Sequence, residues 1–278
     1  MIQPNLVIIG AQKSGTTSLY HYLRSHPEIF MSNPVKEPCY FMKSEFVLQL
    51  FRRKDRTVDS RQEALERYML QGYEAHRYFG EASTYYTIGT NSEMHSVPAR
   101  MKQATPAMKL IYVIRNPFDR IVSNYLHVRR AEYFDGDFRG FLNTGHYQQA
   151  LLTSCYWYQL TAYLDWFPRQ QIKVVLFEDL VRDCEGVMNE LYDFLELQCA
   201  CKVRTDVRNR SENRSSFDAT ELLFPVEAYR DALQVILPDV RKLEEFMHRE
   251  LDVWDLSIEQ WCDVTTVLRA DHSAIKGA

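Results

Sequence analysis

The feature that most constrains the fold is a nine-residue loop at residues 10–18, which joins an apolar run to a helix-like segment. The apolar run at residues 6–9 is typical of a buried strand. Residues 17–25 place Leu19, Tyr20 and Leu23 on one face of a helix. A strand, a glycine-containing loop and a helix in this order predict a parallel α/β unit with an anion site at the start of the helix.

This loop is close to the triphosphate-binding pattern G-x-x-x-x-G-K-[ST], with one departure. Gly10 and Gly15 occupy the glycine positions and Thr17 the final hydroxyl position, but Thr16 stands where the pattern has lysine. Lys13 lies inside the loop instead. The backbone N–H groups at the helix start favour an anion, so we expect phosphate binding without a lysine aimed at a γ-phosphate. The alternative is a helix that hydroxyl groups cap, with Lys13 merely exposed.

A second strand-to-helix turn follows the apolar run at residues 109–114. Asn116 and Pro117 form a typical helix start, since Asn caps helices and Pro suits their first position. Arg115 ends the strand and Ser123 lies two helical turns further on. A guanidinium and a hydroxyl can converge on a second phosphate, although an arginine at a strand end often only pairs with a carboxylate. Together the two turns suggest a nucleotide with two separate phosphate groups.

The rest of the chain alternates strands and helices in the same way. Further strands are expected at residues 78–81 and 172–177, and helices at 153–167, 184–195 and 225–251. The pattern predicts an α/β, P-loop-like, three-layer fold with a central parallel sheet flanked by helices. We expect a single domain over residues 1–278, with an irregular insertion around 40–75.

Composition and charge exclude several classes of protein. The balance of 33 basic and 37 acidic residues, a net charge of −4, disfavours a dedicated nucleic-acid binder. No run reaches the roughly 18 apolar residues of a membrane span, and the first apolar run lacks the flanks of a signal peptide. The six cysteines are scattered without a C-x-x-C pair, so we expect no metal site and reduced thiols in a cytoplasmic protein.

Five segments in order resemble the sulfotransferases that use 3′-phosphoadenosine 5′-phosphosulfate (PAPS), specifically the branch of heparan-sulfate-type and bacterial small-molecule enzymes. Residues 12–19 are similar to the 5′-phosphosulfate loop, and residues 115–125 to the 3′-phosphate segment. Residues 36–41 resemble the K-E-x-x-[FY]-F stretch of that branch. Residues 80–86 and 166–180 are similar to its later segments, but Ala82 stands where the heparan-type enzymes often carry lysine.

The resemblance implies roles for individual residues. Glu37 would be the general base, and Lys13 would contact the bridging oxygen of the phosphosulfate. The late glycine-rich loop of the family is not evident, and Arg210 or Arg214 is the nearest substitute for its donor contact. The remaining donor-binding residues would be Gln12, Ser14, Gly15, Thr16, Thr17 and Ser18 around the 5′-phosphate, and Arg115 and Ser123 around the 3′-phosphate.

The predicted function is sulfuryl transfer from PAPS to a hydroxyl or amine of a small-molecule natural product or a sugar, by in-line attack. 3′-Phosphoadenosine 5′-phosphate (PAP) would be the product, no metal would be required, and the protein would be a monomer or homodimer. One alternative is a nucleotide kinase, and another is a non-catalytic nucleotide-binding protein. His76, His95 and His127 are alternative bases, since another sulfotransferase branch uses histidine.

Overall fold

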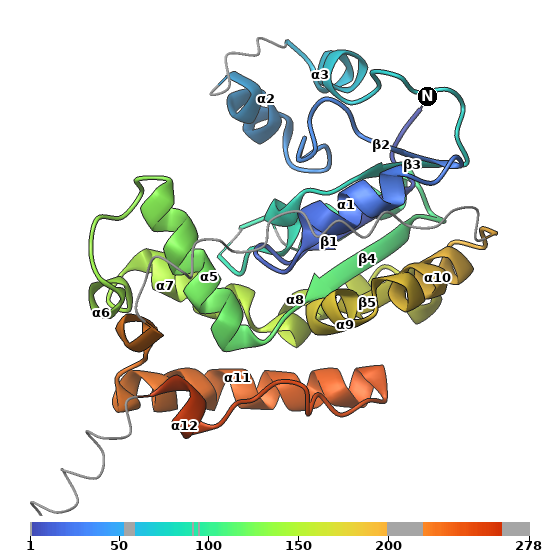
Figure 1. Cartoon of the computed structure of the whole chain (residues 1–278). Helices are drawn as coiled ribbons and strands as arrows, with labels where there is room; N and C mark the ends of the chain where they lie inside the picture. Colours follow the sequence, from blue (N-terminus) through green and yellow to red (C-terminus); the bar gives the residue numbers. More distant parts are fainter. Residues whose placement is uncertain (1, 53–58, 91, 94, 199–218, 263–278) are drawn as a thin grey trace, which may run out of the picture. The chain divides into compact units, whose positions relative to one another are not determined.

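The structure is a computed structural model that describes residues 2–52, 59–90, 92–93, 95–198 and 219–262 (Figure 1). The chain divides into two compact units, which we describe separately. The first unit comprises Met1–Arg115 and Tyr158–Arg208, and the second comprises Asn116–Trp157 and Asn209–Ala278.

A five-stranded sheet forms the centre of the first unit, with the order β2-β3-β1-β4-β5. All four pairings are parallel, which confirms the predicted parallel α/β architecture. The central strands are buried along almost their whole length, as expected when helices cover both faces of a sheet. The strands are β1 (Leu6–Gly10), β2 (Ile29–Met31), β3 (Tyr78–Glu81), β4 (Lys109–Ile114) and β5 (Ile172–Leu176).

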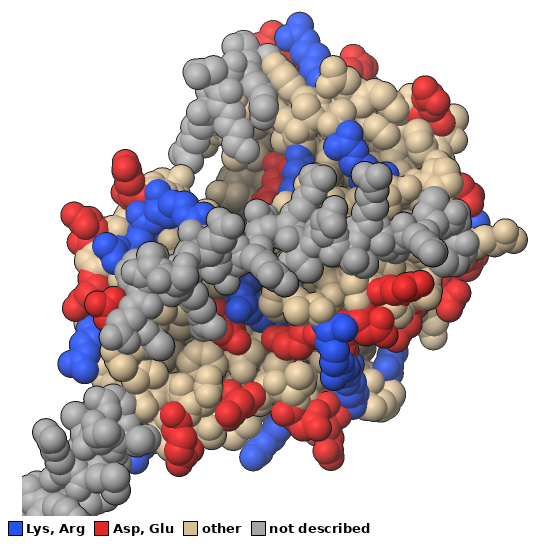
Figure 2. Space-filling model, in the orientation of Figure 1, with Lys and Arg blue, Asp and Glu red and all other residues tan. Residues whose placement is uncertain are grey.

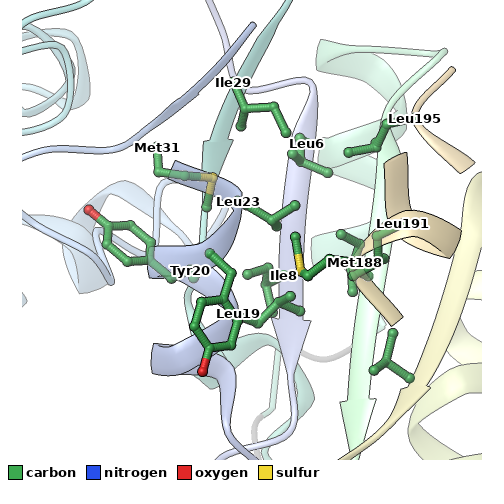
Figure 3. Packing of buried hydrophobic residues seen from close by; sticks show 14 of the residues in the cluster. Leu6, Ile8, Leu19, Tyr20, Leu23, Ile29, Met31, Met188, Leu191 and Leu195 are labelled. Atoms are coloured by element: carbon green, nitrogen blue, oxygen red, sulfur yellow. The ribbon is translucent and has the colours of Figure 1, made fainter. Parts of the chain in front are cut away.

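Helices of the first unit follow the strands and cover the sheet. Leu19 and Leu23 of one helix meet Met188 and Leu191 of another over Ile8 of β1 (Figure 3). Side chains alternate along a strand, so Val7 and Ile9 face the opposite side. At the end of β1, Thr87 Oγ1 donates a hydrogen bond to the Ile9 carbonyl at 2.9 Å. The elements are α1 (Thr16–Arg24), α2 (Ser44–Arg52), α3 (Arg61–Tyr68), η1 (Thr84–Thr87), α4 (Val97–Ala104), η2 (Arg169–Gln171), α9 (Phe177–Arg182) and α10 (Cys184–Phe194). Helix α8 (Tyr156–Leu164) begins in the second unit and continues into the first.

The second unit is helical. Asn116 Oδ1 accepts hydrogen bonds from the backbone N–H groups of Phe118 and Asp119, so it caps the helix as the sequence predicted. Arg120 is fully buried and donates to Ser154 Oγ at 2.7 Å and to the Ala150 carbonyl, which makes it a structural residue. The elements are α5 (Pro117–Arg130), α6 (Phe138–Phe141), α7 (Gly145–Thr153), η3 (Ala219–Leu222), α11 (Val226–Met247) and α12 (Ile258–Trp261).

Two sequence expectations need correction. The helix expected at 153–167 has narrower bounds, because α8 runs from Tyr156 to Leu164 and Thr153 is the last residue of α7. The segment 40–75 was expected to be an irregular insertion apart from a stretch of helical composition at 62–71. α3 lies over that stretch, and α2 was not expected. Ser60 caps α3 by accepting from the Glu63 N–H at 3.0 Å. Both helices are short, so periodicity is a weak signal there.

The surface carries both signs of charge. Figure 2 shows acidic and basic side chains interspersed over the face in view, in line with the small net charge. Within the described ranges, no helix is long and apolar enough to cross a membrane.

Candidate active site

The residues that follow the carboxyl ends of β1, β4 and β5 meet in the first unit, namely the loop 10–18, Arg115 and Phe177, the first residue of α9. The strand order changes direction between the central strands β1 and β4. β2 and β3 lie on the outer side of β1, and β5 lies on the outer side of β4. Parallel sheets bind ligands outside this edge at such a point. The loop after β1 is attached to the neighbouring strand, because the Ala11 N–H donates to the Val113 carbonyl at 2.6 Å.

The loop at residues 10–18 has the backbone of an anion-binding turn. Lys13 and Gly15 are in the left-handed region, with φ of 70° and 89°. Gly15 caps α1, and its carbonyl accepts the Leu19 N–H at 3.2 Å. The first N–H groups of a helix have no partner within the helix, so this turn presents donors and the positive end of the helix dipole to a ligand.

Phe177, the first residue after β5, supports this loop from a distant part of the sequence. A Cβ atom at Gly15 would lie 2.6 Å from Phe177 Cδ2, so only glycine fits this close approach. The guanidinium carbon of Arg115 lies 4.8 Å from the centre of the same ring, and Arg115 Nη1 donates to the Lys13 carbonyl at 3.5 Å. One aromatic ring therefore supports both the loop at residues 10–18 and the arginine that follows β4.

The buried hydroxyl of Ser14 fits an anionic ligand at this loop. Ser14 is fully buried, and its Oγ has no hydrogen-bond partner in the described part of the chain. A buried polar atom without a partner is destabilising, and such atoms often lie where a ligand binds. With the backbone N–H donors of the helix start, this hydroxyl fits the phosphate that the sequence predicts.

The Glu37 carboxylate has two side-chain partners, one of which also contacts this loop. Its Oε1 is 2.8 Å from Lys36 Nζ, and its Oε2 accepts a hydrogen bond from Thr84 Oγ1 at 3.1 Å. Lys36 Nζ also donates to Thr16 Oγ1 at 3.5 Å. Both carboxylate oxygens are thus oriented, and a single ammonium group joins the carboxylate to the first residue of α1.

Behind this arrangement lies a second carboxyl group, Glu81, at the end of β3. Glu81 is fully buried and accepts hydrogen bonds from Ser83 Oγ and Tyr86 Oη. Burial raises the pKa of Glu81 to about 7, and the negative charge of Glu37 contributes in the same direction.

The predicted site residues fall into three groups. The loop residues, Lys13 among them, lie in the first unit with Glu37 and Arg115. Ser123 is a half-buried residue of α5 in the second unit, and the prediction that it shares a phosphate with Arg115 stays a prediction. Arg210 and Arg214 lie outside the described residues.

The alternative histidine bases have different surroundings. His76 precedes β3, at the opposite end of the sheet from the loop, with its ring 5.5 Å from that of Phe30. His95 is exposed just before α4, and His127 belongs to α5 in the second unit. Among the residues that the structure covers, no three His, Cys, Asp or Glu side chains form a metal-binding group.

Sequence reasoning did not identify Phe177, Lys36 or Glu81 as site residues. Phe177 had one available signal, because it ends the strand that the sequence predicted at residues 172–177. Lys36 and Glu81 lie inside quoted motifs, but the connections around them are long-range. Lys36 reaches Thr16, 20 residues earlier, and Ser83, which donates to Glu81, accepts the Cys39 N–H from 44 residues away.

Comparison with known proteins places these features in a family context. Residues 3–252 match the family model described as "Sulfotransferase domain". The bifunctional heparan sulfate N-deacetylase/N-sulfotransferase 4 of Mus musculus is 26% identical over 209 residues, which cover 69% of this chain and 22% of the relative. The human heparan sulfate glucosamine 3-O-sulfotransferase 3B1 is 26% identical over 204 residues, 70% of this chain and 46% of the relative. This chain thus spans less than half the length of either curated relative.

Solved structures agree with the family match. A sulfotransferase from Alicyclobacillus acidocaldarius superposes with a TM-score of 0.71 at 28% identity, over 91% of this chain and 99% of that one. The sulfotransferase domain from the curacin biosynthetic pathway has the same fold, with a TM-score of 0.54 at 16% identity over 90% of this chain and 99% of the domain.

Proposed function

The chain belongs to the sulfotransferase family, and from that premise we propose that it transfers a sulfuryl group from PAPS to a hydroxyl or amine of a small-molecule or sugar acceptor. The family assignment confirms the resemblance that the sequence motifs indicated. The donor, the acceptor and the roles of individual residues are our proposal.

One observation carries the proposal, namely the position of Lys36 between Glu37 and Thr16. Its Nζ is 2.8 Å from Glu37 Oε1 and 3.5 Å from Thr16 Oγ1. A carboxylate that can accept a proton therefore lies next to a loop that can bind a phosphate. Sulfuryl transfer needs these two groups on opposite sides of the sulfur atom, because the acceptor loses a proton while the leaving oxygen gains charge.

In the proposed mechanism, Glu37 accepts the proton of the acceptor O–H or N–H as the acceptor atom attacks sulfur. A new bond to sulfur forms, and the bond between sulfur and the bridging oxygen of the 5′-phosphate breaks. Lys13 and the N-terminus of α1 stabilise the negative charge that this oxygen gains. The phosphate stays bound as part of PAP, with Gln12, Ser14, Thr17 and Ser18 among its ligands.

The 3′-phosphate of the donor is assigned to Arg115 and Ser123, with a further contact from Arg210 or Arg214. The contact of the Arg115 guanidinium with the Phe177 ring supports this assignment, because it restricts the arginine beside the phosphate loop. All stabilising cations in this proposal come from the chain itself. Turnover should therefore persist in EDTA, whereas a nucleotide kinase would need Mg²⁺.

The small net charge of −4 and the mixed charges in Figure 2 favour a small acceptor over a long polyanionic one. The names of the two curated relatives favour a sugar acceptor. Natural-product alcohols, amines and short sugars are therefore the set to screen with PAPS, with mass spectrometry to detect the added sulfuryl group.

Calorimetry tests the donor assignment. We expect the protein to bind PAP tightly and adenosine 5′-phosphate or ATP weakly, because only PAP carries the 3′-phosphate that is assigned to Arg115. Arg115→Ala should weaken the binding of PAP and leave that of adenosine 5′-phosphate unchanged. Equal affinities of the wild type for PAP and adenosine 5′-phosphate would refute the assignment.

Glu37→Gln tests the base, because it keeps the shape of the side chain and removes the charge that accepts the proton. With a hydroxyl acceptor we expect kcat to fall by roughly 10²–10⁴, the usual effect of losing a general base, and PAP affinity to stay unchanged. Glu45→Gln on α2 is the matched control, because Glu45 is an exposed carboxylate nearby in the sequence. A mild effect of Glu37→Gln would contradict the role and return attention to the histidines.

A further inference from the structure

We propose that Glu81 is a positioning residue that holds Glu37 in its reactive place through two hydroxyl groups. The inference rests on the proposed function, since it assigns Glu81 a part in orienting the base of that reaction. It concerns a buried carboxyl group that the mechanism above does not use.

The Glu81 carboxylate lies at the centre of a buried group of hydrogen bonds. It accepts hydrogen bonds from Ser83 Oγ and from Tyr86 Oη. Glu81, Ser83 and Tyr86 are each fully buried, so water does not compete for these bonds. A hydroxyl has a single proton, and here both protons point at the same carboxylate.

The two hydroxyl oxygens in turn bind the backbone that follows Glu37. Ser83 Oγ accepts the backbone N–H of Cys39 at 2.9 Å, and Tyr86 Oη accepts that of Phe41 at 3.0 Å. These amides lie two and four residues beyond Glu37. On the other side of Glu37, the Lys36 carbonyl accepts the Ala82 N–H at 3.2 Å. The backbone around Glu37 is therefore attached to the segment that follows β3 on both sides.

The two hydroxyl groups require a carboxylate as the group at the centre. Each hydroxyl oxygen already accepts a backbone N–H. Its own proton therefore needs a separate acceptor. An ionised carboxylate, the form that Glu81 takes above its pKa of about 7, accepts from both hydroxyls, whereas a glutamine offers one acceptor oxygen and one NH₂ donor. Glu81→Gln therefore keeps the volume and leaves one of the two hydroxyls without an acceptor for its proton.

Other ionisable groups surround the Glu81 carboxylate. The ionisable groups whose charges couple to this cluster are Glu37 and Cys39 on the held segment, Tyr86 on η1 and Tyr163 on α8. Burial beside Glu81 raises the pKa of Tyr86 and that of Tyr163 well above the usual range, so both stay protonated as donors. Tyr163 Oη donates to the Tyr86 carbonyl at 3.1 Å, which fixes η1 from behind.

The held segment has a separate anchor that should keep it folded when Glu81 is changed. Arg100 Nε donates to the Phe41 carbonyl at 2.6 Å, and Glu93 Oε2 accepts the Lys43 N–H at 3.0 Å. Arg100 and Glu93 are themselves joined by an ion pair of 2.5 Å. A change at Glu81 should therefore shift Glu37 rather than release the whole segment.

A double-mutant cycle with the full chain tests the proposal. We expect Glu81→Gln to lower kcat by on the order of 10²-fold, the effect of displacing a reacting group by about 1 Å, while the dissociation constant of PAP stays the same. In a Glu37→Gln background the same change should cost less than about twofold, because two residues that act as a unit are not additive.

Tyr86→Phe and Ser83→Ala each remove one of the two connections while they keep the carboxylate, so they test the proposal even if Glu81→Gln does not fold. Each should lower kcat with PAP affinity unchanged. Tyr78→Phe is the matched control: its buried hydroxyl donates to the Leu195 carbonyl at 2.9 Å, away from Glu37, so its kcat should stay at the wild-type value.

Two results would overturn the proposal. Equal factors for Glu81→Gln in the wild-type and Glu37→Gln backgrounds would make Glu81 a general structural residue, as would a parallel loss of PAP affinity. Tyr86→Phe and Tyr78→Phe with equal kcat would do the same. Failure of the proposed function has a different signature, since the wild type itself would then show no turnover that depends on PAPS.

Discussion

Gly15→Ala is the change whose consequences the structure specifies most closely. The alanine Cβ would lie 2.6 Å from Cδ2 and 3.0 Å from Cε2 of Phe177, and the backbone at this position has a φ of 89°. Two separate costs follow, one from the left-handed backbone and one from the contact with the ring. Gly72 provides a matched control, because its φ is 88° and a Cβ there would meet nothing within 4 Å.

The two costs can be estimated separately. A non-glycine residue in the left-handed region costs about 1–2 kcal/mol, and the smaller entropy of the unfolded alanine chain offsets about 0.4–1 kcal/mol. Gly72→Ala should therefore lower the free energy of unfolding by about 1 kcal/mol. Gly15→Ala adds the overpacking of Phe177, typically about 1–3 kcal/mol, so its total should be about 2–4 kcal/mol.

Urea denaturation of both variants and calorimetry with PAP measure these effects. Because Phe177 also contacts Arg115, its displacement in Gly15→Ala should weaken PAP binding at least about tenfold, or about 1.4 kcal/mol, whereas Gly72→Ala should bind PAP as the wild type does. Phe177→Leu added to Gly15→Ala should recover part of the stability. Equal destabilisation by Gly15→Ala and Gly72→Ala would refute the close contact between Gly15 and Phe177.

Three further predictions follow from charges in the site. Lys13→Ala should lower kcat far more than it weakens PAP binding, because the charge that Lys13 meets grows in the transition state; an unchanged kcat with a raised KM in steady-state assays would make it an anchoring residue. Lys36→Met should lower kcat with an intact fold by circular dichroism, because it removes the ammonium that holds Glu37 Oε1 at 2.8 Å; a wild-type kcat would show that this ion pair is dispensable. Burial raises the pKa of Glu81 from 4.5 to about 7. Between these pH values the folded protein keeps a proton on Glu81 that the unfolded chain has lost. The free energy of unfolding should therefore fall by on the order of 3 kcal/mol as pH rises from about 4.5 to 7. Urea titrations across that range should show this slope in the wild type and its loss in Glu81→Gln, and a slope that persists in the variant would assign it to another group.

Four of the five strands of the described sheet, and the loop that joins β1 to α1, could be predicted from the sequence because their signals are local. The apolar run at residues 109–114 coincides with β4, and Asn116 with Pro117 started α5 as expected. A buried strand needs a short run of apolar residues, and a helix start needs a capping side chain within three residues. Both conditions can be checked within a short stretch of sequence.

The helices α2 and α7 and the strand β2 were not predicted, because they lack a clear local signal in the sequence. β2 has three residues, too few for a pattern, and it is a strand because Ile29, Phe30 and Met31 pair with β3. Short elements gain little from local preference, and most of their stability comes from tertiary packing.

Glu37 was identified from a motif, but its surroundings could only come from the tertiary structure. By itself the pair Lys36–Glu37 is indistinguishable from a solvated ion pair in a loop. The fold brings Thr84 to one carboxylate oxygen and, through Lys36, joins the other to Thr16.

The sequence by itself therefore determined which loops end the central strands and which residues carry charge there. Only the tertiary structure decided that Phe177 lies against Gly15, and that Glu81 is buried behind Glu37 with its proton affinity raised. The physical reason is that burial, close packing and pKa depend on atoms from segments far apart in the chain, which meet only when the parallel strands align their carboxyl ends at one edge of the sheet.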